Sequence, residues 1–330
     1  MNENEKEQHI TSIGGQAVME GVMMRGPHKT AVAVRKPDGD IEIKIDENGT
    51  KKQIKLLRLP IIRGCINFFE SMVIGIKALM YSTEFIDLEY GEEETESKFD
   101  RWLEDKFGDK IKDIVIYVSL FLSLILSVGL FILLPTAATR GIEGLLGGKL
   151  FGVPQWLSSM VATKTFTSVM EGILRMVIFI TYLALVAQMK DMKRVFQYHG
   201  AEHKTIACYE AGEELTVENV KHHRRFHPRC GTSFLLFVMI VSIILFSLLP
   251  RTGIILRMLM RLALLPVVAG LSYEIIKLAG RSKNKCVAWL TKPGLWLQKL
   301  TTNEPDETQI EVAIASMKAV IPEDKSEDRW

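Results

Sequence analysis

The chain has 330 residues, of which 48% are hydrophobic and 24% are charged, and its formal net charge is +2. This composition is more apolar than that of most soluble domains, and it is typical of membrane spans joined by hydrated segments. The small net charge, with no basic stripe interleaved with aromatic residues, argues against nucleic-acid binding. The four cysteines lie far apart without a C-x-x-C pair, so we do not expect a disulfide framework.

The N-terminal region contains two contrasting segments. "SIGGQAVMEGVMMRGPHKT" has four glycines before a proline, a composition typical of a loop with close backbone approaches. In "TAVAVRKPDGDIEIKI", apolar and polar residues alternate on both sides of Pro37, Asp38 and Gly39, which predicts a β-hairpin. Because two strands alone are not stable, the hairpin should pack on another element.

An apolar stretch from Leu59 to Ile86 carries charges seven residues apart, at Arg63, Glu70, Lys77 and Glu84. This spacing places the charges on one face of a helix. Two interpretations fit: a helix lying on a membrane, or an amphipathic helix packed in a protein core. The acidic run "EYGEEETESKFD" that follows is typical of a solvated linker.

Four apolar segments are expected to cross a membrane. Ile114–Pro135 has no charge over about the 20 residues that cross a hydrocarbon core. The others are residues 169–188, with Glu171 and Arg175 one turn apart and able to pair; 234–249; and 259–279, with Arg261 and Glu274. The predicted fold class is a mainly α, polytopic helical membrane protein with about four transmembrane helices and a small N-terminal β-hairpin element.

The charges that flank these segments predict their orientation. Between the second and third spans lie Lys190, Lys193, Arg194, Lys204, Lys221, Arg224, Arg225 and Arg229, whereas the first loop holds Arg140, Lys149 and Lys164. The positive-inside rule places the first set in the cytosol, and four spans then put both termini on the cytosolic side of the cytoplasmic (inner) membrane. Arg251 and Arg257, at the external ends of the last two spans, are the exception to this charge bias. If the 59–86 helix also crossed the membrane, the N-terminus would lie outside.

These segments divide the chain into six parts. They are residues 1–58, a cytosolic loop and hairpin; 59–112, the amphipathic helix and acidic linker; 113–189, the first two spans with an external loop; 190–232, a cytosolic His- and Cys-rich segment; 233–280, the last two spans; and 281–330, a cytosolic tail. In the tail, Thr302 or Asn303 can cap a helix that begins near Pro305 and buries Val312, Ile314 and Val320.

The segment "HGAEHKTIACYEAG" carries the main candidate chemistry. On a helix, His199, Glu202 and His203 fall within an arc of about 100°, so both imidazoles reach one ion. This is the H-x-x-E-H arrangement of inverted zinc peptidases, in which zinc acidifies a water and the glutamate is the general base. Five of the seven histidines lie in the wider segment 190–232 with Cys208 and Cys230, which favours Zn²⁺ or another divalent metal over histidines that contact lipid phosphate.

Two helical ligands do not close a metal site, so a third is expected. Glu210 shares the helix face but lies about 10 Å beyond His203 along the axis, too far to join it. His227 and Cys230 in "RFHPRCGT" are candidates, because Pro228 fixes a turn between them. The alternative is structural: a helix start capped by Thr232, with Cys230 merely buried.

Glu274 and a group of arginines have alternative interpretations too. A carboxylate in a span is costly unless it pairs or faces a hydrated cavity. Glu274 lies near the cytosolic end of the last predicted span, so it is a candidate third ligand or proton acceptor for the metal site. Alternatively, it could pair with Lys277. Arg224, Arg225 and Arg229 could hold a phosphate or an anionic headgroup, or could reflect the positive-inside bias alone.

Three motifs together, "GGQAVMEGVMMRGP", "YHGAEHKTIACYEAG" and "HPRCGTSF", resemble those of the bacterial YqhQ family, and the resemblance covers Ile13 to Ile321. The family is of unknown function and is described as predicted metal-dependent enzymes of the membrane. The resemblance implies that the residues matching its first motif belong to the functional surface: Gly14, Gly15, Gln16, Glu20, Gly21 and Arg25.

Two functions remain open. The first is a zinc-type hydrolase that acts at the cytosolic face of the membrane on a peptide or a lipid-linked molecule. The second is a noncatalytic membrane factor that assists assembly of membrane proteins or moves a lipid or solute. Intramembrane Glu171, Arg175 and Glu274 and the Met-rich "VMEGVMMRG" favour the second. The expected partners are the lipid bilayer and either a membrane protein or a lipid-linked molecule.

Overall fold

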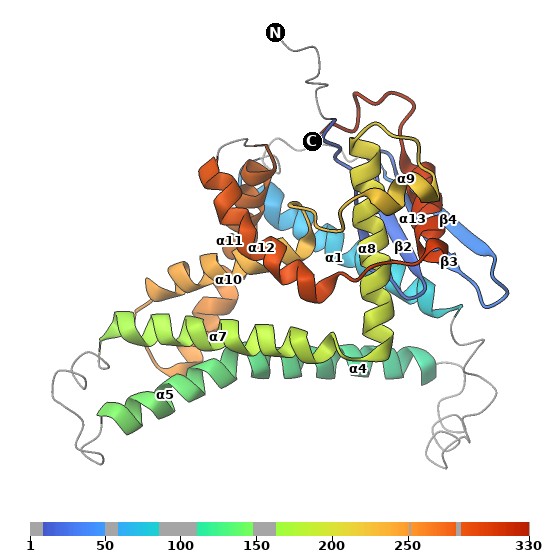
Figure 1. The fold of residues 1–330 in the computed structure, drawn as a ribbon. Coiled ribbons are helices and arrows are strands. Elements are labelled where there is room, and N and C mark those ends of the chain that lie inside the picture. Colours follow the sequence, from blue (N-terminus) through green and yellow to red (C-terminus); the bar gives the residue numbers. More distant parts are fainter. Residues whose placement is uncertain are drawn as a thin grey trace, which may run out of the picture. The chain divides into compact units, whose positions relative to one another are not determined.

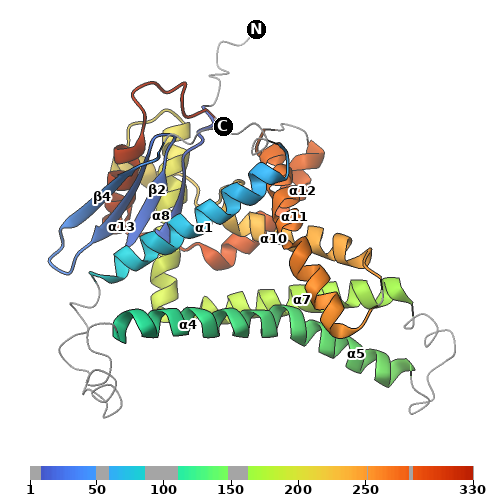
Figure 2. The same ribbon diagram turned by 180° about the vertical axis from the view of Figure 1, so that it is seen from behind.

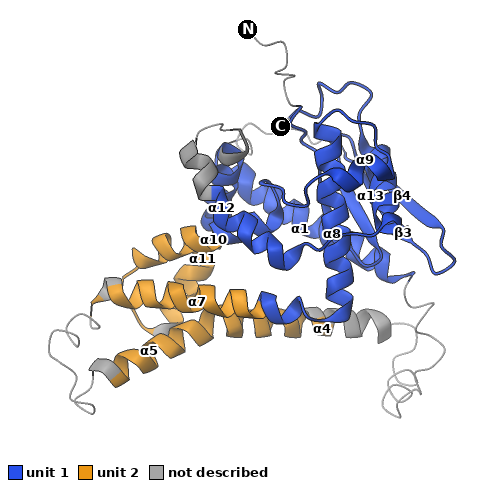
Figure 3. Ribbon diagram, in the orientation of Figure 1, with its two compact units in different colours: residues 1–89, 183–238, 266–330 blue, residues 90–182, 239–265 orange. Residues whose placement is uncertain are grey.

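The computed structural model describes residues 9–49, 59–85, 111–147, 163–250, 252–281 and 285–329. Most of these residues are helical, and a four-stranded antiparallel sheet lies near the N-terminus (Figure 1). Two compact units divide the chain: residues 1–89, 183–238 and 266–330 form the first, and residues 90–182 and 239–265 form the second (Figure 3). The predicted mainly helical class is confirmed, whereas the acidic run at residues 89–100 lies outside the described residues.

The sheet has the order β1-β2-β3-β4, with strands β1 (Gly14–Val18), β2 (Gly21–Arg25), β3 (Lys29–Arg35) and β4 (Ile41–Glu47). The predicted hairpin is confirmed as β3 and β4, and Gly39 in its turn has φ +92°. The prediction of a loop in the preceding segment was wrong, because residues 14–25 form a second hairpin. This hairpin turns at Glu20, whose φ is 49°.

The glycines explain why this hairpin was predicted as a loop. Glycine is common in loops, but here it allows the strands to pack closely against neighbouring backbone. A Cβ on Gly21 would lie 2.3 Å from the Ala33 carbonyl oxygen, and one on Gly26 would lie 2.5 Å from that of Val320. Only glycine fits such contacts without displacing backbone. Composition therefore could not distinguish a loop from tightly packed strands.

Helices cover both faces of the sheet. Helices α8 (Lys190–Glu210) and α13 (Glu307–Val320) pack on one face, with the short α9 (Val217–His222) beside them. Helix α1 (Ile62–Thr83) lies across the other face (Figure 2). Tyr198, Ile310 and Met317 are fully buried in the larger core between the sheet, α8 and α13. This core holds the candidate site in place.

The C-terminal region contains α12 (Lys285–Thr301) as well as α13. Asp306 caps α13, rather than Thr302 or Asn303 as predicted, and forms a capping box with Gln309. The predicted burial of Val312, Ile314 and Val320 is confirmed, because this side of α13 packs on β2 and β3.

Three helices among the described residues are long and apolar enough to cross a membrane: Phe121–Leu145, Phe166–Val186 and Ile255–Leu278. The first runs through α4 (Ile111–Val128), a π-helical stretch (Gly129–Leu133) and α5 (Leu134–Gly147); the others lie in α7 (Lys164–Val186) and α11 (Ile254–Arg281). The remaining predicted span, residues 234–249, corresponds to α10 (Gly231–Ser247), which is apolar but shorter. These helices indicate a membrane protein.

Charged side chains are buried inside the second unit. Glu171 pairs with Arg175 at 3.3 Å, as their spacing predicted, and also accepts hydrogen bonds from Arg261, whose Nη2 is 2.8 Å away. The Thr136 hydroxyl donates a third contact at 2.8 Å. A carboxylate is retained among apolar helices only with such partners, because an unpaired buried charge costs several kcal/mol.

Candidate metal centre

Helix α8 and the start of α10 bring three candidate metal ligands together. His199 and His203 lie one turn apart on α8, and Cys230 directly precedes α10. One ligand atom from each residue lies within 4.8 Å of the others. Two imidazole nitrogens and a thiolate sulfur form a donor set that suits Zn²⁺.

Backbone carbonyls orient both imidazoles. His199 Nδ1 lies 2.7 Å from the Thr301 oxygen, and His203 Nδ1 lies 2.6 Å from the Arg225 oxygen. Because a carbonyl only accepts, Nδ1 carries a proton in each ring and Nε2 is left as the ligand atom. His199 Nε2 lies 3.2 Å from Cys230 Sγ. Metal-binding histidines are commonly held in this way.

The three side chains also share charge. Burial opposes ionisation of Cys230, but His199 and His203 hold the pKa of its thiol well below the usual value. Burial by itself would lower the pKa of His199, yet the adjacent Cys230 raises it to about 9. Without a metal, Cys230 is therefore a thiolate beside a His199 imidazolium, and thiolate is the form that binds metals.

Glu202, on the same turn, is 4% exposed, and its Oε2 has no hydrogen-bond partner among the described residues. Its carboxylate accepts a hydrogen bond from the Gly15 backbone, and burial raises its pKa because the charged form is desolvated. An unsatisfied buried oxygen costs about 1–3 kcal/mol. Such an atom next to three candidate ligands fits a site that holds an ion and its water.

Residues of the first motif position this site from the sheet. A Cβ on Gly15 would lie 2.9 Å from the Glu202 Cδ atom, so only glycine allows β1 to approach that carboxylate. Glu20, at the turn, binds the Arg194 guanidinium of α8 and accepts a hydrogen bond from the Tyr198 hydroxyl at 3.2 Å. Two motifs about 180 residues apart in sequence thus meet in space.

Three other residues of that motif, Gln16, Arg25 and Gly14, face α1 or open space. Gln16 Oε1 lies against Gly75 of α1, where a Cβ would be 2.2 Å away. Arg25 pairs with Glu70 at 3.0 Å. A Cβ on Gly14 would meet nothing within 4 Å. The motif therefore serves both faces of the sheet rather than one surface.

His227 lies next to the three ligands but has other partners. Its ring centroid is 5.7 Å from that of His203, and its Nε2 is 3.5 Å from Glu210 Oε2. Burial lowers its pKa. The Gln298 amide fixes its backbone, accepting from the His227 N–H at 2.8 Å and donating to the His227 carbonyl at 2.7 Å.

Sequence reasoning missed the contributions of Gln298, Thr301 and Gly200. A Cβ on Gly200 would lie 2.0 Å from the Asn303 oxygen, so this glycine lets the chain after α12 approach α8. That approach brings the Thr301 carbonyl to His199. The glycine inside the H-x-x-E-H motif was the one available signal, since glycine is rare within helices.

The structure places Glu274 elsewhere. Its carboxylate accepts two hydrogen bonds from Arg63 of α1, at 2.7 and 2.5 Å. Arg63 therefore satisfies this carboxylate, and Glu274 does not belong to the three-ligand group. The two residues are 211 positions apart, so no local pattern in the sequence indicates this pair.

The three arginines near the motif do not form one patch. Arg229 is largely buried and binds Glu210. Arg225 pairs with Glu304 at 3.2 Å, whereas Arg224 is exposed. Arg225 and Arg229 thus tie parts of the first unit together, and Arg224 alone of the three is fully at the surface.

A second group, Cys208, Glu213 and His223, also has three ligand atoms within 4.8 Å of one another. His223 Nε2 lies 3.1 Å from Glu213 Oε2. Burial raises the pKa of Cys208 to about 11, so its thiol is protonated at neutral pH. This group is therefore less prepared for a metal than the first.

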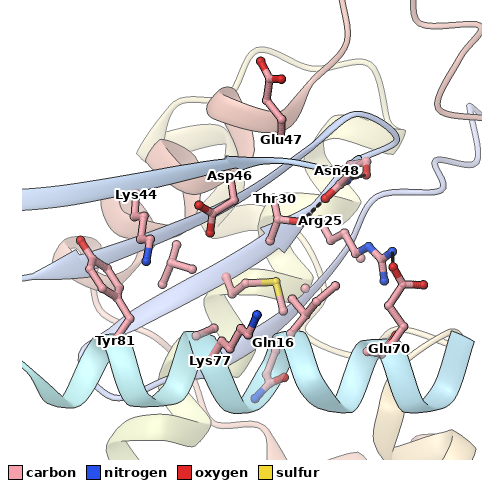
Figure 4. Close-up of a pocket in the computed structure, with 18 of the residues that line it drawn as sticks. Gln16, Arg25, Thr30, Lys44, Asp46, Glu47, Asn48, Glu70, Lys77 and Tyr81 are labelled. Carbon is pink, nitrogen blue, oxygen red and sulfur yellow. Dashed lines mark hydrogen bonds and ion pairs between the residues drawn. The ribbon is translucent and has the colours of Figure 1, made fainter. Parts of the chain in front are cut away.

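A large groove lies on the opposite face of the sheet from the three ligands, between the strands and α1. Its volume is about 1490 Å³, and both signs of charge line it, including Lys44, Asp46 and Lys77 (Figure 4). Successive residues of a strand point to opposite faces. Gln16 accordingly faces this groove while Gly15 faces Glu202.

Comparisons with known proteins agree with the motif resemblance. The family described as "Protein of unknown function (DUF1385)" matches residues 59–323. The chain is 35% identical over 314 residues to "Uncharacterized protein YqhQ" of Bacillus subtilis (strain 168), an alignment that covers 93% of this chain and 92% of that protein. No solved structure matches the chain.

Proposed function

The chain belongs to the DUF1385 family, described as proteins of unknown function, and we propose that it is a zinc-type hydrolase of the bacterial inner membrane. His199, His203 and Cys230 hold the ion, and Glu202 is the general base. When bound there, such an ion supplies Lewis acidity and acidifies a water molecule.

The orientation of the two imidazoles supports this proposal most strongly. Each Nδ1 is held by a carbonyl, which leaves both Nε2 atoms for a ligand beside Cys230. A pair of surface histidines would have no reason to be fixed this way by two separate segments, the end of α12 and the chain between α9 and α10.

Glu202 has the properties of a general base or acid in this setting. Burial raises its pKa, so it can hold and release a proton closer to neutral pH than an exposed glutamate does. The Gly15 backbone fixes the carboxylate, and the free Oε2 is the atom that takes the proton.

We place the site near the cytosolic surface of the membrane. Helix α8 begins four residues after the candidate span that ends at Val186. The excess of lysine and arginine in residues 190–229 supports a cytosolic position. A substrate that reaches this site is a peptide or a lipid-linked molecule at the bilayer surface.

Metal content tests the ligands. Protein purified after expression with added zinc should contain about one zinc per chain, measured by plasma mass spectrometry. The double variant His199→Ala, His203→Ala should contain none, whereas Glu202→Gln and the exposed control His222→Ala should keep theirs. Equal metal in the wild type and the double variant would contradict the proposed site.

Hydrolysis is tested without knowing the substrate. Hydrolysis transfers one oxygen of water to a product, so zinc-loaded protein in nanodiscs is incubated with a bacterial membrane extract in ¹⁸O-labelled water. Mass spectrometry should find ¹⁸O-labelled products that Glu202→Gln does not form. Identical product sets from both proteins would show that Glu202 catalyses no hydrolysis.

The thiolate beside His199 favours a second candidate, a metal-free cysteine nucleophile, because a thiolate–imidazolium pair activates cysteine. Activity that survives complete removal of metal but is lost in Cys230→Ser would establish it. Protein without metal whose cellular function survives Glu202→Gln would instead be a noncatalytic membrane factor.

A further inference from the structure

Helix α1 exposes an apolar stripe along its whole length. Ile62, Phe69, Val73, Ile76 and Met80 are exposed, from 37% for Ile62 to 49% for Phe69. At about 100° per residue these five side chains fall within an arc of roughly 60°. A continuous apolar surface of this kind marks a contact with a partner or a membrane.

The buried side of α1 consists of small residues instead. Gly64, Gly75, Ala78 and Ser82 are its buried positions. Ala78 belongs to the small core under the sheet, and the Ser82 hydroxyl accepts a hydrogen bond from the Met19 backbone at 3.2 Å. A helix of a soluble domain buries its large apolar residues, so α1 has the reverse arrangement.

The charged residues of α1 do not shield the apolar stripe. Glu70 pairs with Arg25 of the sheet, and Lys77 lines the groove (Figure 4). Arg63 binds Glu274. The helix therefore directs its charges to a flank that faces protein and the charge-lined groove, and it leaves the apolar stripe uncovered within the first unit.

The start of α1 is held against a candidate membrane span. A Cβ on Gly64 would lie 2.9 Å from the Gly270 oxygen and 2.9 Å from Tyr273 Cβ, so the two helices touch there. The span in α11 ends at Leu278, four residues beyond Glu274. At 1.5 Å per residue, the Arg63–Glu274 pair is about 6 Å from that end, at the depth where headgroups meet acyl chains.

We infer that α1 lies in the bilayer surface, with its apolar stripe in lipid. The 22 residues of α1 extend for about 33 Å along this surface. Lipid, rather than a soluble partner, is the occupant, because the lipid that surrounds the end of α11 also reaches the first turn of α1. Interfacial helices bury their apolar face roughly 5–10 Å into the same boundary.

This placement has a consequence for the groove between α1 and the sheet. With α1 in the bilayer surface, the groove opens at the level of the lipid headgroups. A molecule that enters it therefore approaches along the membrane, whatever chemistry the three ligands on the other face of the sheet perform. The inference does not depend on the proposed hydrolase.

Fluorescence quenching tests the placement in the full-length protein in nanodiscs. A genetically encoded fluorescent amino acid replaces Val73 in the stripe or, as the matched control, Lys77 on the groove flank. Bromines in the upper acyl chains should remove about half of the emission at position 73, and aqueous iodide should have little effect there. Position 77 should show the opposite preference.

Two results would overturn the inference. Iodide quenching at position 73 equal to that at position 77 would mean that water covers the stripe. Protection of position 73 from both quenchers would mean that protein covers it, whether the second unit, another copy of the chain or a different partner.

Discussion

His199 illustrates how a single contact sets the chemistry of this site. In the metal-free protein its neighbour Cys230 raises the pKa of the imidazole to about 9, above its ordinary 6.5. Below about pH 9 the ring is therefore protonated, and a metal must displace that proton. Above it the ring is already neutral.

Zinc binding should therefore depend on pH in a defined direction. Since one proton leaves His199, the affinity should rise about tenfold per pH unit from pH 7 to about 9 and then level off. Competition with a chromophoric chelator of known proton affinity measures this. In Cys230→Ser the pKa of His199 falls, because the thiolate that raised it is gone, so the rise should end at a lower pH than in the wild type. An affinity constant from pH 7 to 9 in the wild type would contradict the prediction.

Alanine substitutions at Gly15 and Gly14 test how closely strand β1 approaches Glu202. In Gly15→Ala, the new Cβ would lie 2.7 Å from the Met23 oxygen and 2.9 Å from the Glu202 carboxyl carbon. We expect a loss of about 1–3 kcal/mol in unfolding free energy, as overpacking produces, and loss of any activity that needs Glu202.

Gly14→Ala is the control, since nothing lies within 4 Å of its Cβ. Thermal unfolding followed in the same membrane mimetic should separate the two variants. Equal midpoints would show that β1 does not approach Glu202 as closely as described.

At the scale of elements, α5, α7 and α11 depend on one ion network. Glu171 of α7 neutralises one positive charge among Arg175 and Arg261, and Thr136 at the start of α5 binds the same carboxylate. The Arg261 Nε atom is buried with no hydrogen-bond partner among the residues described. The network therefore has no spare acceptor to compensate for loss of the carboxylate.

Glu171→Leu should destabilise the second unit by about 3–5 kcal/mol, because two arginines are left without their anion. The measurement is the amount of protein that accumulates in the membrane and its thermal midpoint in detergent. Ile173→Ala, two residues away at a position 52% exposed, should change both little. Wild-type accumulation of Glu171→Leu would mean that water or lipid reaches these arginines.

At the scale of the whole molecule, the first unit is assembled from three separate stretches of chain, residues 1–89, 183–238 and 266–330. The two ends of the described chain meet within it, where the Thr11 hydroxyl donates to Asp328 at 2.6 Å. The candidate spans come between these stretches, so the orientation of the spans in the membrane decides on which side the candidate metal centre lies.

Thiol labelling of intact cells tests this topology. Single cysteines are introduced at Gly147 and Glu213 in a cysteine-free background, and an impermeant reagent is applied. The lysine and arginine bias predicts labelling at Gly147 and none at Glu213 until the cells are opened. Labelling at Glu213 in intact cells would place the histidines outside and exclude a cytosolic mechanism.

Sequence patterns that repeat within a few residues were sufficient to predict much of the secondary structure of this protein. Alternation around Gly39 predicted β3 and β4, and the spacing of His199, Glu202 and His203 placed them together on one helix. Apolar runs predicted four spans, and three of them correspond to described helices long enough to cross a membrane. Each pattern reports local geometry, because the period of a strand or helix is set by the backbone itself.

Tertiary packing decided the rest. Whether "GGQAVMEGVMMRGP" forms a loop or strands, and that Gly15 touches Glu202, depend on segments far apart in the chain. The same holds for the partnership of Glu274 with Arg63 and for the carbonyls behind both histidines. A carbonyl has no side chain to mark it in a sequence, and a contact across 100 or 200 residues has no period. Such contacts exist only once the chain has packed, which is why only the folded structure could supply them.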